Sequence, residues 1–131
     1  MILFSYRHSI KARWKDENGH RVIRWLCGSA HGECWRQSLL LKSHKVVYIP
    51  EGETDALTLL SIGVERPGES LVLALASAEI LPKTEPFRDK TIIIVPDPDD
   101  PGVKAAIKLK TRLEEAVADV FIIPISEITN G

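Results

Sequence analysis

From Val46 onward, short apolar runs alternate with stretches whose apolar residues recur at helical spacing. The apolar runs lie in "KVVYIP", "SLVLALAS", "KTIIIVPD" and "DVFIIPIS", and their continuous Val, Ile and Leu content is typical of strands buried on both faces. Between them, "TDALTLLSI" and "GVKAAIKLKTRLEEAVA" predict helices, the first ending at Gly63, and the connector "AEILPKTEPFRD" has room for one helical turn. The pattern predicts an α/β domain with a mostly parallel sheet of about four strands and flanking helices.

The front of the chain has a different pattern, in which apolar and basic residues alternate. "SIKARW" and "HRVIRWLC" flank "KDENG", and Asn18-Gly19 is a strong hairpin-turn signal because both residues tolerate positive φ. A further short strand is expected at "SLLL". A two-residue turn centred on Asn18-Gly19 pairs Trp14 with Ile23, Ala12 with Trp25, and Ile10 with Cys27.

This pairing places the charged residues of the hairpin on one face. Arg13 then lies opposite Arg24, with Lys11 and Lys15 beside them. Like charges directly opposite each other are unfavourable, so this face would favour a bound phosphate. We therefore expect a small basic β-hairpin unit at residues 1–44 and an α/β domain at residues 45–131.

Charge is unevenly distributed along the 131 residues. Residues 1–50 carry nine Lys and Arg against three acids, a net +6, whereas residues 51–131 carry eight against fifteen, a net −7. A basic segment beside an acidic body suggests that one part meets an anion and the other a cation, although both could be solvated faces. No apolar run reaches the ~18 residues of a membrane span. Cys27 and Cys34 make no disulfide framework, so a cytoplasmic location is expected.

Two acidic clusters follow predicted strands. "EGETDA" places Glu51 just past its strand, Gly52 at a sharp turn and Asp55 in the first turn of a helix. "VPDPDDPG" places Asp97 and Asp99 just past another strand, where the prolines favour extended backbone. Ligands bind beyond the carboxyl ends of parallel strands, so both clusters would meet at one crevice if the two strands are neighbours. Carboxylates without nearby His or Cys select Mg²⁺ or Mn²⁺.

Each cluster taken alone also has a purely structural explanation. Asp55 beside a capping Thr54 is ordinary chemistry for a helix N-terminus, and "PDPDDPG" could be a surface turn. Trp14 and Trp25 are better explained as hairpin core than as platforms for nucleic-acid bases. A zinc site is disfavoured, because the spacing of its candidate ligands matches no common zinc finger; these are His20, Cys27, His31 and Cys34.

"EGETDA" after one apolar strand, followed by "DPDDPGVKAA" after another, resembles the Toprim domain of bacterial-type primases, type IA and II topoisomerases and related nucleases. The likeness covers about residues 45–128 and implies a Rossmann-like sheet. "EGETDAL" and the "VKAA" helix look most like primases of phages, plasmids and other mobile elements, and the basic β-unit resembles the helicase-primase arrangement. "LALASAEI" lacks the glycine often found after the second strand. The residues that match the Toprim pattern are Glu51, Gly52, Asp55, Asp97, Asp99 and Gly102.

The resemblance implies nucleotidyl transfer with Mg²⁺ or Mn²⁺. Glu51 would act as general base or as a metal-linked carboxylate, Asp97 and Asp99 would hold the metal, and Asp55 would support the catalytic site. Asp100 is a candidate further ligand. The implied partners are a single-stranded DNA template, nucleoside triphosphates and a helicase in the same or a separate chain, with no membrane. The residues expected to contact phosphates are Lys11, Arg13, Arg24, Lys104 and Lys108.

Two other functions share these features. A Toprim-type nuclease would use the same carboxylates to direct water, and a non-catalytic nucleic-acid-binding or replication-scaffold module would keep the fold with a vestigial site. Lys104 and Lys108, four residues apart, also fit a solvated helix face. We expect the chain to be part of a longer protein, because primases of this kind often carry a zinc-binding template reader and a helicase region.

Overall fold

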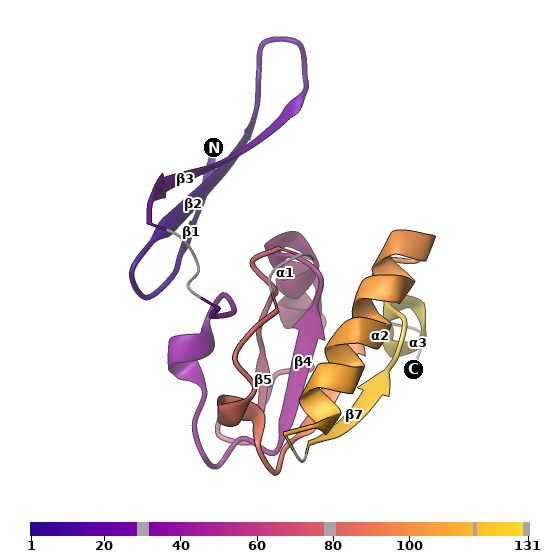
Figure 1. Cartoon of the computed structure of the whole chain (residues 1–131). Helices are drawn as coiled ribbons and strands as arrows, with labels where there is room; N and C mark the ends of the chain where they lie inside the picture. The colour runs from indigo at the N-terminus through magenta and orange to yellow at the C-terminus, as the bar shows by residue number, and fades with distance from the viewer. Residues whose placement is uncertain (29–31, 78–80, 117, 130–131) are drawn as a thin grey trace.

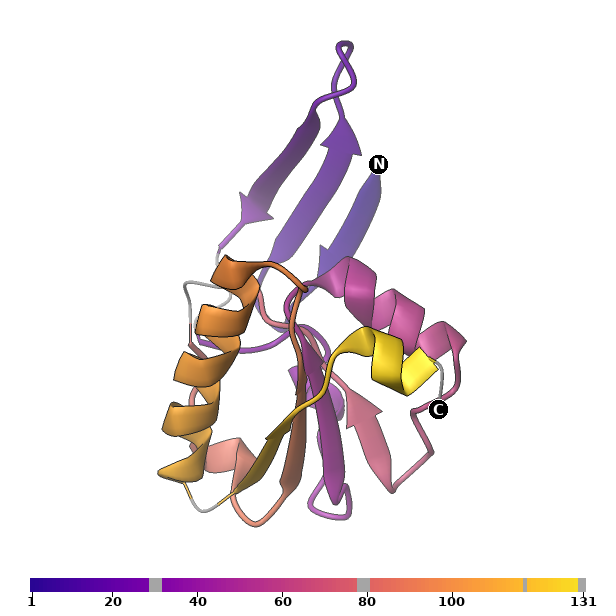
Figure 2. The same cartoon turned by 90° about the vertical axis from the view of Figure 1, so that its right-hand side faces the viewer.

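The computed structural model describes residues 1–28, 32–77, 81–116 and 118–129. Two separate sheets form the molecule, an antiparallel one at the N-terminus and a parallel one in the remainder. The antiparallel sheet stands beyond one end of the parallel sheet, as both views make clear (Figures 1 and 2). Its strands lie in the order β1 (Ile2–Ser5), β2 (Ile10–Lys15) and β3 (Arg21–Cys27), and we refer to it as the β-unit.

The parallel sheet has four strands in the spatial order β5-β4-β6-β7. All its neighbouring pairs are parallel. The predicted fold class is therefore confirmed: a parallel sheet with flanking helices, preceded by a small antiparallel β-unit. The second strand is shorter than its apolar run suggested. The bounds are β4 (Val46–Pro50), β5 (Ser70–Val72), β6 (Thr91–Val95) and β7 (Asp119–Ile122).

Helices cover both faces of the parallel sheet (Figure 2). Helix α2 (Asp100–Glu114) packs on one face, whereas α1 (Glu53–Ser61) and α3 (Ile125–Thr129) pack on the other. On β4, Val47 and Ile49 belong to the α2 side of the core and Tyr48 to the α1 side. Burial on both faces is why the strands read as continuous apolar runs. None of the helices in the described residues has the length and apolarity needed to cross a bilayer.

The ends of the first helix agree only partly with the sequence. Gly63 follows the helix with φ +81°, the left-handed geometry expected just past a helix C-terminus. The N-cap, however, is Gly52, so the predicted cap at Thr54 is wrong. Helix α3 was not predicted, whereas the 3-10 turn η2 (Glu85–Phe87) confirms the helical turn expected in the connector.

The hairpin between β2 and β3 differs from the prediction by one residue. Asp16 N–H donates to the carbonyl of His20 (2.9 Å), and Gly19 N–H donates to the carbonyl of Asp16 (3.0 Å), so the loop holds three residues rather than two. Gly19 has φ +79°, as the third position of such a loop requires. The predicted register is therefore wrong between the turn and a bulge at Ile10/Lys11, which restores the predicted pairing of Ile10 with Cys27.

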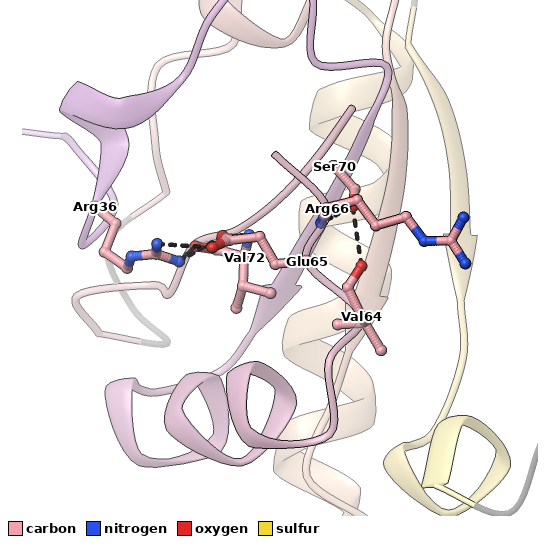
Figure 3. A network of polar contacts seen from close by, with 6 residues as sticks. All are labelled: Arg36, Val64, Glu65, Arg66, Ser70 and Val72. Carbon is pink, nitrogen blue, oxygen red and sulfur yellow. Dashed lines mark hydrogen bonds and ion pairs between the residues drawn. The ribbon is translucent and has the colours of Figure 1, made fainter. Parts of the chain in front are cut away.

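Residues 32–44 connect the two sheets without forming a strand. The strand predicted at "SLLL" is wrong, because Gln37–Leu39 is the 3-10 helix η1. Arg36 fastens this segment to the parallel sheet by donating to both carboxylate oxygens of Glu65 (2.7 and 3.0 Å) and to the carbonyl of Val72 at the end of β5 (2.8 Å), as Figure 3 shows. Trp35 meets the ring of Phe4 edge-on at 5.2 Å, so apolar packing also joins the β-unit to the domain.

Candidate metal and nucleic-acid site

The two acidic loops meet because the strands that precede them are neighbours. β4 and β6 pair in parallel up to Pro50 and Val95, so Glu51 and Asp97 leave the sheet at the same end. The backbone N–H of Asp97 donates to Oε2 of Glu51 at 3.2 Å. This confirms the expectation that both clusters converge on one sheet edge.

The converging carboxylates disfavour one another's charged forms. Burial raises the pKa of Glu51, and the charges of Asp97 and Asp99 add to this rise, while the hydrogen bond from Asp97 N–H opposes it. The pKa of Asp55 is raised by burial and by a hydrogen bond and repulsion with the Asp97 side chain, against the attraction of Arg13. A cation placed among these oxygens would relieve the repulsion.

Asp99 has a structural task of its own. It is the N-cap of α2, and its Oδ1 accepts a 2.6 Å hydrogen bond from Gly102 N–H. An acid at this place also interacts favourably with the positive end of the helix dipole. Asp100 is the first residue of the helix and is exposed. Of the predicted metal ligands, Glu51 and Asp97 are therefore joined by a hydrogen bond, and Asp99 caps the helix that follows.

The two glycines of the acidic loops serve different purposes. A Cβ on Gly102 would lie 2.6 Å from the carbonyl oxygen of Asp97, 2.8 Å from Asp99 Oδ1 and 3.0 Å from Glu51 Oε2, so only glycine lets the loops pack this closely. The chain bends at Gly52 as predicted, but its backbone is extended (φ −148°, ψ 168°), a conformation that any residue can adopt, so the bend does not require glycine. A Cβ there would meet no protein atom within 4 Å and would instead project into open space.

A cleft of about 730 Å³ separates the acidic loops from the β-unit. Glu51, Asp55 and Asp97 line its floor. The opposite wall comes from one face of β2 and β3, where the observed register pairs Arg13 with Ile23 and Lys11 with Trp25. The side chains of this wall are Lys11, Arg13, Arg21, Ile23 and Trp25.

The residues predicted to contact phosphates are therefore distributed unevenly. Arg13 lies in the cleft and hydrogen-bonds the Thr54 hydroxyl. Arg24 pairs with Ala12, on the opposite face of the β-unit, so the predicted pairing of Arg13 with Arg24 is wrong. Lys104 and Lys108 are exposed on α2 and are not part of the cleft lining.

Lys11 is held in a buried ion pair whose partner the sequence reading missed. Its Nζ lies 2.9 Å from Oε1 of Glu53, and it also donates to the carbonyl of Ala76 (2.7 Å). Tyr6 OH donates to the same Glu53 oxygen at 2.8 Å. Glu53 stands inside "EGETDA", and only its burial, which the local sequence does not encode, distinguishes it from its neighbours. Arg21 and Trp25 were missed as cleft residues because of the one-residue error in register.

The donor chemistry of the acidic loops fits a hard divalent cation. Glu51, Asp55, Asp97 and Asp99 offer only oxygen, and Mg²⁺ keeps several of its waters, so a few carboxylates suffice. In the described residues no three His, Cys, Asp or Glu side chains already stand in a geometry that could hold a metal ion. Water, substrate phosphates and side-chain rotation would have to complete the coordination shell.

The disfavoured zinc site gains no support from the described residues. His31 lies outside them, and Cys27 is exposed whereas Cys34 is buried. Burial, followed by a smaller effect of Glu33, raises the pKa of the Cys34 thiol to about 12.

Comparison with known proteins adds one finding. The profile of a protein family described as Toprim-like matches residues 48–130, which is more than half of the chain. The matched range begins within β4 and includes both acidic loops. A search of curated proteins finds no match to the chain.

Proposed function

The chain belongs to the Toprim-like family, and from this membership we propose that it is the catalytic core of a primase, which joins nucleotides into primers on single-stranded DNA with Mg²⁺ or Mn²⁺. Toprim domains process nucleic acids with the help of acidic residues and a divalent metal. The main support for primase activity is that the carboxylates of two loops face a wall with arginine and tryptophan side chains across a single cleft. Such a cleft suits an anionic strand whose reacting end must reach a metal.

The acidic floor would supply the chemistry. Mg²⁺, when bound by Glu51, Asp97 and Asp99, would neutralise the triphosphate and the leaving pyrophosphate. Glu51 would accept the proton of the attacking 3′-hydroxyl as a general base, because it follows β4 and lines the acidic floor of the cleft. Its Oε2 is held by Asp97 N–H, so Oε1 is the oxygen proposed to take the proton. Asp55 would support the site from the first turn of α1.

The basic wall would hold the substrate. Arg13 and Arg21, which line the cleft, would contact phosphates, and the ring of Trp25 on the same wall would stack on a base. Trp25 is held edge-on against Tyr6, with the two ring centres 5.0 Å apart, and this contact orients the Trp25 ring. Lys104 and Lys108 are proposed as secondary phosphate contacts outside the cleft. A helicase, in the same or a separate chain, would deliver the single-stranded template.

The proposal is tested by incubating the protein, and any longer chain that contains it, with single-stranded DNA, labelled nucleotides and Mg²⁺ or Mn²⁺. Labelled primers that disappear in Asp97→Asn/Asp99→Asn support the primase. DNA shortened in a metal-dependent way would replace it with a Toprim nuclease, which uses the same carboxylates to direct water. Binding of DNA without either product, from every version of the chain, would indicate a replication scaffold.

A further inference from the structure

The ion pair between Lys11 and Glu53 joins the β-unit to the domain directly beside the acidic floor. Its two side chains are only 10% and 3% exposed, and their charged atoms lie 2.9 Å apart. The network around the pair comes from separate parts of the chain: Tyr6 precedes β2, Lys11 lies within it, Glu53 begins α1, and Ala76 follows β5. No other described ion pair links the β-unit to the parallel-sheet domain.

Because both side chains are buried, each charge depends on the other as its partner. A charge removed from water is tolerated only when a partner and further hydrogen bonds satisfy it. Glu53 Oε1 accepts from both Lys11 and Tyr6, and Lys11 adds the Ala76 carbonyl. Burial, followed by the charge of Glu53, raises the pKa of Tyr6, so its hydroxyl remains a donor. The β-unit is therefore held at a defined distance from α1.

The same strand carries the pair and the substrate wall. Arg13 lies two residues beyond Lys11, on the same face of β2, and reaches Thr54 next to Glu53. Trp25 is the cross-strand partner of Lys11, and the Lys11 ammonium lies 5.7 Å from the centre of its ring. Any movement of Lys11 would therefore move both Arg13 and Trp25 relative to the carboxylates.

We infer that Lys11 and Glu53 are positioning residues, whose buried pair holds the β-unit wall over the acidic floor so that the cleft fits a single strand of nucleic acid. This inference rests on the proposed function for the identity of the ligand. It also gives Lys11 a positioning role in place of the expected phosphate contact, because its ammonium group is paired with Glu53.

Two variants separate positioning from direct contact. Glu53→Gln keeps the positive charge of Lys11 and removes its partner, whereas Lys11→Met removes the charge. If the pair positions the wall, both variants weaken binding of a thymidine oligonucleotide by about tenfold. Neither variant then changes the dependence of log Kd on log salt, because no phosphate contact is lost. If Lys11 contacts phosphate, Glu53→Gln binds as tightly as the wild type or tighter, and Lys11→Met lowers the salt dependence; either result overturns the inference.

Lys15→Met provides the matched control for the loss of one lysine charge from β2, because Lys15 is exposed and lies on the same strand and face as Lys11. Hydrogen exchange provides a readout that needs no substrate. In both pair variants, amides of β1 to β3 and of the first turn of α1 should exchange faster, while those of β4 and β6 stay protected and Mg²⁺ affinity is unchanged. Unchanged exchange in the β-unit would overturn the inference even if the chain proves not to bind DNA. If the wild type does not bind DNA, that result counts against the proposed function. Faster exchange in the two pair variants would still support the role of the Lys11–Glu53 pair in holding the β-unit.

Discussion

The backbone N–H of Asp97 donates a 3.2 Å hydrogen bond to Oε2 of Glu51, and this contact joins two loops that are 46 residues apart in the sequence. Asp55 completes the cluster from the start of α1, through its contact with the Asp97 side chain. None of the ion pairs among the described residues involves these three carboxylates. The protein therefore tolerates mutual repulsion at this sheet edge, which is typical of a site built for a cation.

Removing charge from the cluster should stabilise the protein at neutral pH. The folded-state pKa values of Glu51 and Asp55 are raised above their ordinary values of 4.5 and 3.8. The folded chain therefore binds protons more tightly than the unfolded one, so this contribution to stability is present below about pH 4 and is lost as pH rises through the folded pKa values. Glu51→Gln/Asp55→Asn should match the wild type in free energy of unfolding near pH 4 and exceed it at pH 7, as measured by urea denaturation.

The wild type and the Glu51→Gln/Asp55→Asn variant also test whether Mg²⁺ binds at this cluster. At pH 7, Mg²⁺ at a hundredfold excess over its Kd should stabilise the wild type by about 2.7 kcal/mol and leave the double variant unchanged. NaCl at matched ionic strength controls for general screening. Equal stabilisation of both proteins would show that the ion binds elsewhere.

Two substitutions separate the helix-capping role of Asp99 from its proposed role as a metal ligand. Asp99→Ala removes the acceptor of Gly102 N–H and should cost about 0.5–2 kcal/mol of unfolding free energy. Asp99→Asn keeps a capping oxygen and should leave stability nearly unchanged, because Asn caps helices as well as Asp does. Both variants should lose Mg²⁺ affinity by calorimetry. Retained affinity in Asp99→Asn would restrict this residue to its structural task.

A methyl group at Gly102 should disturb the cluster. In Gly102→Ala the new Cβ would lie 2.6 Å from a backbone oxygen of Asp97, which cannot rotate away. The overpacking should cost about 1–3 kcal/mol, against a gain of at most ~1 kcal/mol for Ala over Gly inside a helix, so a net loss of stability is expected. Calorimetry should also show weaker Mg²⁺ binding, because Glu51 Oε2 and Asp99 Oδ1 must shift.

Gly52→Ala is the matched control for this substitution. A Cβ on Gly52 meets nothing within 4 Å, so the only expected cost is the poorer N-cap, up to about 1 kcal/mol. Mg²⁺ affinity should stay at the wild-type level. A larger loss of stability in Gly52→Ala than in Gly102→Ala would mean that the close approach around Gly102 is not what holds the loops.

The sequence predicted the acidic floor better than the opposite wall, and the reason is physical. Long Val and Ile runs report burial on both faces, and parallel strands bring residues that follow them, such as Glu51 and Asp97, to one edge. The hairpin register depends instead on one choice: Asn18-Gly19 fits a two-residue turn and also the last two positions of a three-residue loop. The observed three-residue loop shifts the register by one residue, which places Trp25 on the cleft wall and Arg24 on the opposite face.

Contacts between distant segments were beyond the reach of local patterns. Glu53 looks in the sequence like any exposed acid in a helix first turn, and its burial arises only once Lys11 of the β-unit packs against it. Strand β1 was missed because a four-residue edge strand has too few positions to show alternation.

The corrected register predicts which arginine of the β-unit meets nucleic acid. Arg13 faces the cleft beside Asp55, whereas Arg24 pairs with Ala12 on the opposite face. Arg13→Ala should therefore weaken binding of a thymidine oligonucleotide and lower the slope of log Kd against log salt by about 0.7, the value for one phosphate contact on a single strand. Arg24→Ala removes the same charge from the same small sheet and should leave both quantities close to the wild type. Fluorescence anisotropy across a salt series distinguishes the two variants, and equal losses would show that the strand is attracted by the overall charge of the β-unit and does not enter the cleft.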